Sequence, residues 1–247
     1  MRIKALIAYD GSRFEGFQSQ KHTANTVMGT LQRALKNLGV DSKIVGSGRT
    51  DRGVHATAQV IHFDLPTFWE LERFGGYFQK KLGPFIKVRR LSFAPPHFHA
   101  RFDAKSRAYR YILTPNPPTP FEAAYLCYEP NLNKKLIDKA LTLFEGRHDF
   151  AYFMKTGSDT KSSVRTIYRT TTYEHRGRFV LYIEGDAFLR AQVRMMVAFL
   201  LKISRKELTL TQLQEQLAKK ARHSTTLAPP GGLYLCRVIY STNAALI

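Results

Sequence analysis

The chain contains, at positions 46–63, the stretch Gly46-Ser-Gly-Arg-Thr-Asp-Arg-Gly-Val-His55-Ala-Thr-Ala-Gln-Val-Ile-His-Phe63. Three glycines surround a single carboxylate, Asp51, and glycine adopts the positive φ angles that let a backbone turn tightly beside a ligand. The apolar residues after Ala56 are typical of a strand that is at least partly buried. Two interpretations fit the pattern: a loop that presents one acid at the end of a rigid strand, or a hairpin turn with a solvated Arg–Asp pair.

Strands and helices alternate on both sides of this stretch. In the first half, the spacing of apolar residues predicts a strand over 3–9, a helix over 27–38, a strand after 56, a helix over 69–82 and a strand over 86–93. In the second half it predicts a strand over 107–113, a helix over 132–144, strands over 164–173 and 179–184, helices over 188–202 and 211–220, and a last strand over 233–240. We expect loops at the prolines of 114–120 and at the polar run 156–163.

This alternation predicts an α+β protein of two domains, 1–104 and 105–247, with the Asp51 loop in the first. In the predicted helix over 188–202, Arg190 and Arg194 lie i,i+4 beside the apolar face. An arginine at that position indicates an anionic partner.

The chain is strongly basic, with 38 Lys and Arg residues against 19 Asp and Glu residues and a formal net charge of +19. Such an excess attracts polyanions, so nucleic acid is the favoured partner and a membrane surface the second choice. The basic residues form short clusters rather than one long tail, which indicates a folded basic surface.

Neither the cysteines nor the histidines indicate a metal site. Cys127 and Cys236 stand in apolar surroundings, as small core residues of a reducing compartment do. His97 and His99 lack further ligands nearby, so they fit RNA contacts or surface residues better than zinc ligands. Without an apolar signal segment or a run of about 20 apolar residues, the chain is expected in the cytoplasm.

The stretch Gly48-Arg-Thr-Asp-Arg-Gly-Val-His-Ala56 closely resembles the signature Gly-Arg-Thr-Asp-x-Gly-Val-His-Ala of the tRNA pseudouridine synthase A family. Other blocks resemble the family in the same order and span nearly the whole chain, at 9–18, 98–101, 106–111, 164–167, 192–194 and 227–234. The chain departs from the family pattern at Phe17 (usually Trp), at 190–192 (Arg-Ala-Gln in place of His-His-Met) and at Ala198 (usually Gly). These departures remove no proposed catalytic group, so we expect them to alter the fit to tRNA or the packing and not the reaction.

The resemblance implies two ferredoxin-like domains whose sheets abut, with a basic active-site cleft between them. It also implies a homodimer that isomerises uridine to pseudouridine at positions 38, 39 and 40 of the tRNA anticodon stem-loop. The isomerisation breaks the C1′–N1 bond and rejoins the base through C5 without a redox step, so we expect no cofactor.

The resemblance assigns roles to individual residues. Asp51 matches the catalytic Asp and is the expected nucleophile; Arg194 matches the Arg that pairs with it. Arg49 matches an Arg that holds the flipped nucleotide, and Tyr109 matches a Tyr that stacks on the target base, where an aromatic face replaces lost base stacking. We expect further RNA contacts from basic residues in or next to these blocks: Arg52, His55, Arg101, Arg107, Arg110 and Arg190.

Two other classes of protein compete with this interpretation. A non-catalytic RNA-binding protein has the same charge, but it has no use for a carboxylate that repels phosphate at its binding surface. A nucleoside hydrolase normally uses two cooperating carboxylates. The sequence offers no second acid beside Asp51.

Overall fold

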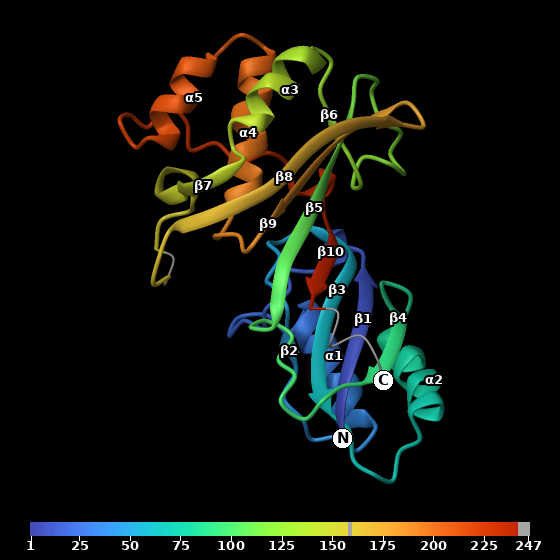
Figure 1. Cartoon of the computed structure of the whole chain (residues 1–247). Helices are drawn as coiled ribbons and strands as arrows, with labels where there is room; N and C mark the ends of the chain where they lie inside the picture. Colours follow the sequence, from blue (N-terminus) through green and yellow to red (C-terminus); the bar gives the residue numbers. More distant parts are fainter. Residues whose placement is uncertain (158–159, 242–247) are drawn as a thin grey trace. The chain divides into compact units, whose positions relative to one another are not determined.

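The computed structural model describes residues 1–157 and 160–241 of the chain. By its internal contacts the chain divides into two units, one made of Met1–Lys105 with the chain from Tyr234 on, the other of Ser106–Leu233. Each unit combines β-strands with helices (Figure 1). The chain is therefore a mixed α+β protein, as predicted. Part of the expected polar loop at 156–163 lies outside the described residues.

The first unit contains the strands β1 (Arg2–Tyr9), β2 (Val45–Gly46), β3 (His55–Asp64), β4 (Ile86–Phe93) and most of β10 (Leu233–Tyr240), with the helices α1 (Val27–Asn37) and α2 (Leu71–Leu82). β1 is central and pairs antiparallel with β3 and β4, while β2 and β10 both pair with β3. β10 runs parallel to β3, with Tyr234 opposite His55. This pairing corrects the predicted domain 105–247, because it ties the last strand to the first unit.

The core of the first unit follows from the apolar pattern. Alternate residues of β1 are fully buried, whereas their neighbours are half-buried. On the same face of the sheet, the Phe63 ring of β3 lies 5.8 Å from both Phe74 and Phe78 of α2. Helix α1 follows the N-cap residue Thr26, whose hydroxyl accepts a hydrogen bond from the Gly29 N–H at 3.0 Å. The helix–sheet layer is thus fixed by residues that the sequence pattern identifies.

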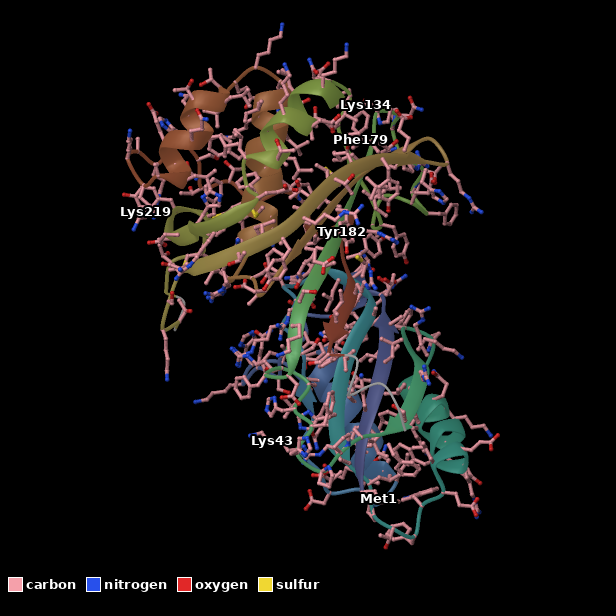
Figure 2. The ribbon with its side chains drawn as sticks, viewed as in Figure 1. Met1, Lys43, Lys134, Phe179, Tyr182 and Lys219 are labelled. Carbon is pink, nitrogen blue, oxygen red and sulfur yellow. The ribbon has the colours of Figure 1, made fainter. Side chains whose placement is uncertain are left out.

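The second unit contains most of β5 (Ala104–Thr114), together with β6 (Cys127–Tyr128), α3 (Lys134–Thr142), β7 (Gly146–Asp149), β8 (Val164–His175), β9 (Arg178–Gly185), α4 (Gln192–Ser204) and α5 (Leu210–Leu217). Its strands run in the order β5-β9-β8-β7, and β6 pairs with β5. The ammonium of Lys134 on α3 lies 5.7 Å from the Phe179 ring of β9 (Figure 2). Such a cation–π contact helps to hold a helix on its sheet.

The start of α4 differs from the prediction. Ala191 takes a left-handed conformation (φ +61°), and the Leu189 N–H donates to Gln192 Oε1 at 2.8 Å. The helix therefore begins at Gln192 and not at Phe188, so the expected i,i+4 pairing of Arg190 with Arg194 on one helix was wrong. The short strands β2, β6 and β7 were not predicted, because two to four residues are too few to show a period.

Within residues 1–157 and 160–241, no helix is both long and apolar enough to cross a membrane. Nor do three or more His, Cys, Asp or Glu side chains gather as a metal ion would need. Cys127 is buried and Cys236 is half-buried.

His62 on β3 makes the stability of the first unit dependent on pH. Its side chain is buried and its Nδ1 accepts a hydrogen bond from the Ala100 N–H at 3.0 Å. Burial, and secondarily the charge of Arg2, lowers the pKa of His62 to about 4. The unfolded chain, with an ordinary His pKa near 6.5, therefore binds the proton more strongly than the folded chain.

Stability should consequently be complete above about pH 6.5 and decline as the pH falls toward 4. Between pH 7 and pH 5, we expect the free energy of unfolding to fall by about 2 kcal/mol from this group. Urea unfolding of the wild type and of His62→Gln at both pH values measures this fall. Gln is the chosen replacement because it can accept the same hydrogen bond without titrating. An equal pH dependence in both proteins would contradict the assignment.

Candidate active site

The Asp51 loop is anchored through the residue before the acid. Thr50 is buried, whereas the residues on either side of it are more accessible: Arg49 is exposed and Asp51 is half-buried. The Thr50 carbonyl accepts a hydrogen bond from the Phe17 N–H at 3.1 Å, and its hydroxyl shares one with the Tyr9 hydroxyl at 2.8 Å. Thr50 therefore fixes the loop while Arg49 and Asp51 remain accessible.

The C-terminal side of the loop closes as a tight turn. The Val54 N–H donates to the Asp51 carbonyl at 3.1 Å, and Gly53 between them has φ +78°. A residue with a side chain rarely adopts this angle, which explains the glycine after Arg52. The turn leads directly into β3, so the acid stands at the end of a strand.

The N-terminal side of the loop is held by buried polar and aromatic groups. The Ser47 hydroxyl lies 2.6 Å from Gln59 Oε1, and the Gln59 amide donates to the Gly48 carbonyl at 2.9 Å. A Cβ at Gly46 would lie 2.5 Å from the Phe17 ring. Phe17, one of the departures from the family pattern, thus packs directly beneath the loop.

His55 does not lie where an RNA contact would require. The residue is 2% exposed, and its ring stacks on Tyr234 with centroids 4.7 Å apart. Its Nδ1 accepts a hydrogen bond from the Gly11 N–H at 3.0 Å. These contacts argue against the predicted substrate contact and assign His55 a positioning role: it joins the segment after β1 and strand β10 to the end of the loop.

Two of the expected RNA-binding arginines of the first unit reach the surface near Asp51. Arg49 is exposed, and the Arg52 side chain is 76% exposed with its Nη1 3.2 Å from Glu15 Oε2. An ion pair this exposed contributes little to stability, so phosphate can compete for Arg52. Arg101, also exposed, lies in the connection between β4 and β5.

The remaining predicted residues lie in the second unit. Tyr109 on β5 is 8% exposed, and its ring forms a T-shaped contact with the Phe188 ring, with centroids 5.1 Å apart and planes at 86°. Arg107, on the same face of β5, is buried and donates to the Asp186 carbonyl at 2.8 Å. Arg110 is exposed, as an RNA contact would be.

Arg194 is held by the segment that follows α5. Its Nε donates to the Ala228 carbonyl at 2.8 Å, and the Ala228 N–H donates to the Arg194 carbonyl at 3.1 Å. The Tyr111 hydroxyl donates to the Pro229 carbonyl at 2.8 Å, and burial raises the pKa of this hydroxyl far above its usual range. Residues of three blocks distant in sequence, 106–111, 192–194 and the part of 227–234 before Tyr234, therefore meet within the second unit. Arg190 is exposed in the turn before α4.

Three positioning residues were not identified as such from the sequence: Tyr9, Gly11 and Gln59. Tyr9 and Gly11 belong to the block 9–18, so their resemblance to the family was a signal, but their contacts were not deducible. Gln59 is fully buried between apolar neighbours on β3. A polar residue in such a strand needs a hydrogen-bond partner, which was the available clue.

Comparisons with known proteins cover most of the chain, although the family model leaves out the block 106–111. A family model described as tRNA pseudouridine synthase matches residues 5–103 and 140–241. The tRNA pseudouridine synthase A of Helicobacter hepaticus is 45% identical over 243 residues, covering 96% of this chain and 98% of its own. That of Wolinella succinogenes is 43% identical over 248 residues, covering 98% and 95%. That of Campylobacter jejuni strain 81-176 is 36% identical over 245 residues, covering 97% and 100%.

Proposed function

We propose, since the chain belongs to the tRNA pseudouridine synthase family, that it converts uridines 38, 39 and 40 of the tRNA anticodon stem-loop with Asp51 as the nucleophile. Membership makes the protein an isomerase that forms pseudouridine in tRNA. The observation that carries the finer proposal is the Asp51 loop: one half-buried carboxylate of the matched signature stands on a loop anchored on both sides.

The proposed chemistry needs the Asp51 carboxylate in its ionised form at an extruded uridine. The carboxylate bonds either to the ribose C1′ or to the uracil C6, and the C1′–N1 bond breaks. The base then rejoins the sugar through C5, and the bond to Asp51 breaks to release the free carboxylate. The proton on C5 leaves to solvent and N1 gains one, so no oxidant or reductant is involved. We propose that two guanidinium groups act here, those of Arg49 and Arg194, and that they bind the phosphates of the flipped nucleotide.

The proposal extends to architecture and assembly. The order β1-α1-β2-β3-α2-β4 supports a ferredoxin-like topology for the first unit, and we propose the same class for the second. We propose that Tyr109 and Arg194 join Asp51 at the uridine in a basic cleft, and that the enzyme is a cytoplasmic homodimer. The net charge of +19 supports a basic RNA-binding surface.

Tritium release from tRNA that carries 5-tritiated uridine tests the proposed function directly. Only a reaction that forms a bond at C5 expels this label, so binding without catalysis releases none. Pseudouridine mapping in tRNAs with single uridines at 38, 39 or 40 then tests the position. No release from any tRNA would leave the RNA-binding interpretation, and release only from other positions would refute the anticodon assignment.

Tyr109 offers a test of the stacking role. Tyr109→Phe keeps the aromatic face and should retain most of the activity, whereas Tyr109→Ala loses the face and should cost roughly 1–3 kcal/mol in binding the base. For each variant, tritium release at saturating tRNA measures the turnover, and tritium release at limiting tRNA includes the loss in binding. If Phe is as inactive as Ala, the hydroxyl transfers a proton and stacking is not the whole role.

A further inference from the structure

Phe102, in the connection between β4 and β5, is a large aromatic residue that lies on the surface and not in the core. It is 74% exposed. One side of its ring stacks on His99, with centroids 4.3 Å apart and planes 21° from parallel. The exposed fraction shows that much of the ring remains accessible for a second stacking partner.

Hydrogen bonds close the turn that carries Phe102. The N–H groups of Arg101 and Phe102 both donate to His99 Nδ1, at 3.2 and 3.1 Å. The Asp103 N–H donates to the His99 carbonyl at 3.0 Å, and the His99 N–H donates to Asp103 Oδ2 at 2.9 Å. A ring held in this way loses little conformational freedom when it binds a planar ligand.

The turn is also fixed to the sheet of the first unit. The Ala100 N–H donates to His62 of β3, and Arg2 of β1 donates to the Phe98 carbonyl at 2.7 Å. His62 lies seven residues along β3 from His55, the residue that ends the Asp51 loop. At about 3.3 Å per residue, this separation is on the order of 20 Å. Ala100, two residues before Phe102, is therefore held far from the Asp51 loop, and we infer that Phe102 does not contact the uridine there.

The charges around Phe102 fit a nucleotide. The Arg101 guanidinium lies 5.6 Å from the ring centroid, and both Arg101 and Lys105 are exposed. The nearby carboxylate, Asp103, accepts a hydrogen bond from the His99 N–H. An accessible aromatic face flanked by cations is how proteins bind unpaired nucleotides, with the base on the ring and the phosphate on the cation.

We infer that Phe102 is a stacking site for an unpaired base of the substrate tRNA, distant from the reacting uridine, with Arg101 contacting the adjoining phosphate. The inference rests on the proposed function and adds a substrate-binding residue to it. Because the site is remote from the chemistry, it acts on tRNA affinity and not on the turnover of bound tRNA.

The test compares Phe102→Ala with Phe121→Ala, a matched control at a residue that is 89% exposed in the second unit. We expect Phe102→Ala to raise KM for tritium release about tenfold, equal to about 1.4 kcal/mol, with kcat unchanged. The Kd for tRNA, measured by filter binding in an Asp51→Asn background, should rise by the same factor. Phe121→Ala should stay within twofold of the wild type.

Phe102→Trp provides a direct readout of stacking. It should keep KM near the wild-type value, and tRNA should quench fluorescence that the wild type, whose one tryptophan is Trp69, does not lose. Thermal unfolding checks each variant; if Phe102→Ala does not fold, Phe102→Leu keeps the apolar bulk and should show the same rise in KM and Kd.

Equal KM and Kd values for Phe102→Ala and Phe121→Ala would overturn the inference, as would a fall in kcat at unchanged KM. The proposed function fails separately, when the wild type releases no tritium. The Kd comparison then still decides whether Phe102 binds tRNA.

Discussion

Asp51→Asn should lower turnover by at least about four orders of magnitude, more than about 5 kcal/mol in transition-state free energy. The substitution keeps the size of the side chain but removes the charge and the nucleophilicity that the reaction requires. Fold and tRNA binding should survive, because the loop is held through Thr50, Gly48 and the Asp51 main chain. Single-turnover tritium release and filter binding measure the two effects.

Asp41→Asn is the matched control, since Asp41 is an exposed carboxylate ten residues earlier in the same unit. It should release tritium at the wild-type rate. Binding by the Asp51→Asn variant can tighten, because the lost carboxylate repels phosphate. A folded Asp51→Asn protein that works within tenfold of the wild-type rate would refute both the nucleophile and the mechanism.

Gly11→Ala should have the second-largest effect, on both stability and activity. A Cβ at this position would lie 2.0 Å from the Val54 carbonyl oxygen and 2.4 Å from its carbon. The obstruction is main chain and cannot rotate away, so the segment must move. Overpacking of this kind costs roughly 2–3 kcal/mol.

The movement should also displace the active-site loop, because the Val54 N–H is hydrogen-bonded to the Asp51 carbonyl and His55 Nδ1 to the Gly11 N–H. A misplacement of about 1 Å lowers rates about 100-fold, so we expect turnover to fall by that factor at a temperature where the variant is folded. Urea unfolding and tritium release measure both losses.

Gly76→Ala is the control for a glycine with space around it. Nothing lies within 4 Å of a Cβ built there, and the residue is in helix α2. This variant should be more stable by about 1 kcal/mol and fully active. Wild-type stability and activity in Gly11→Ala would show that the packing against Val54 does not position the loop.

Much of the secondary structure could be predicted from the sequence, because its signals are local. The alternation along β1 and the cap at Thr26 depend on neighbouring residues, and β4 and β10 were found at their predicted bounds. The predicted start of α4 was wrong for a local reason too. The apolar spacing continues through Phe188 and Leu189, but Ala191 has a left-handed conformation and the helix begins only after it. Apolar periodicity carries no information about backbone handedness at one residue.

The candidate site residues could be identified from the sequence, but their division into substrate-contacting and loop-supporting residues could not. Asp51, Arg49, Tyr109 and Arg194 came from motif resemblance, and their chemical roles remain predictions. His55 belongs to the same signature, yet its 2% exposure and its contacts with Gly11 and Tyr234 make it part of the support. Motif matching identifies residues that recur together, but it does not separate those that touch the substrate from those that hold the loop.

The sequence by itself determined the α+β class, the basic character of the chain and the identity of the one carboxylate in the signature, because composition, periodicity and motif are properties of the chain alone. The tertiary structure decided that the strand from Tyr234 on pairs with β3, and that 106–111, 192–194 and 227–234 meet around Arg194 and Tyr111. It also decided how Tyr9, Phe17 and Gln59 hold the Asp51 loop. The physical reason is range: these contacts join residues that are distant in sequence, and they form only when burial brings their backbone and polar groups together.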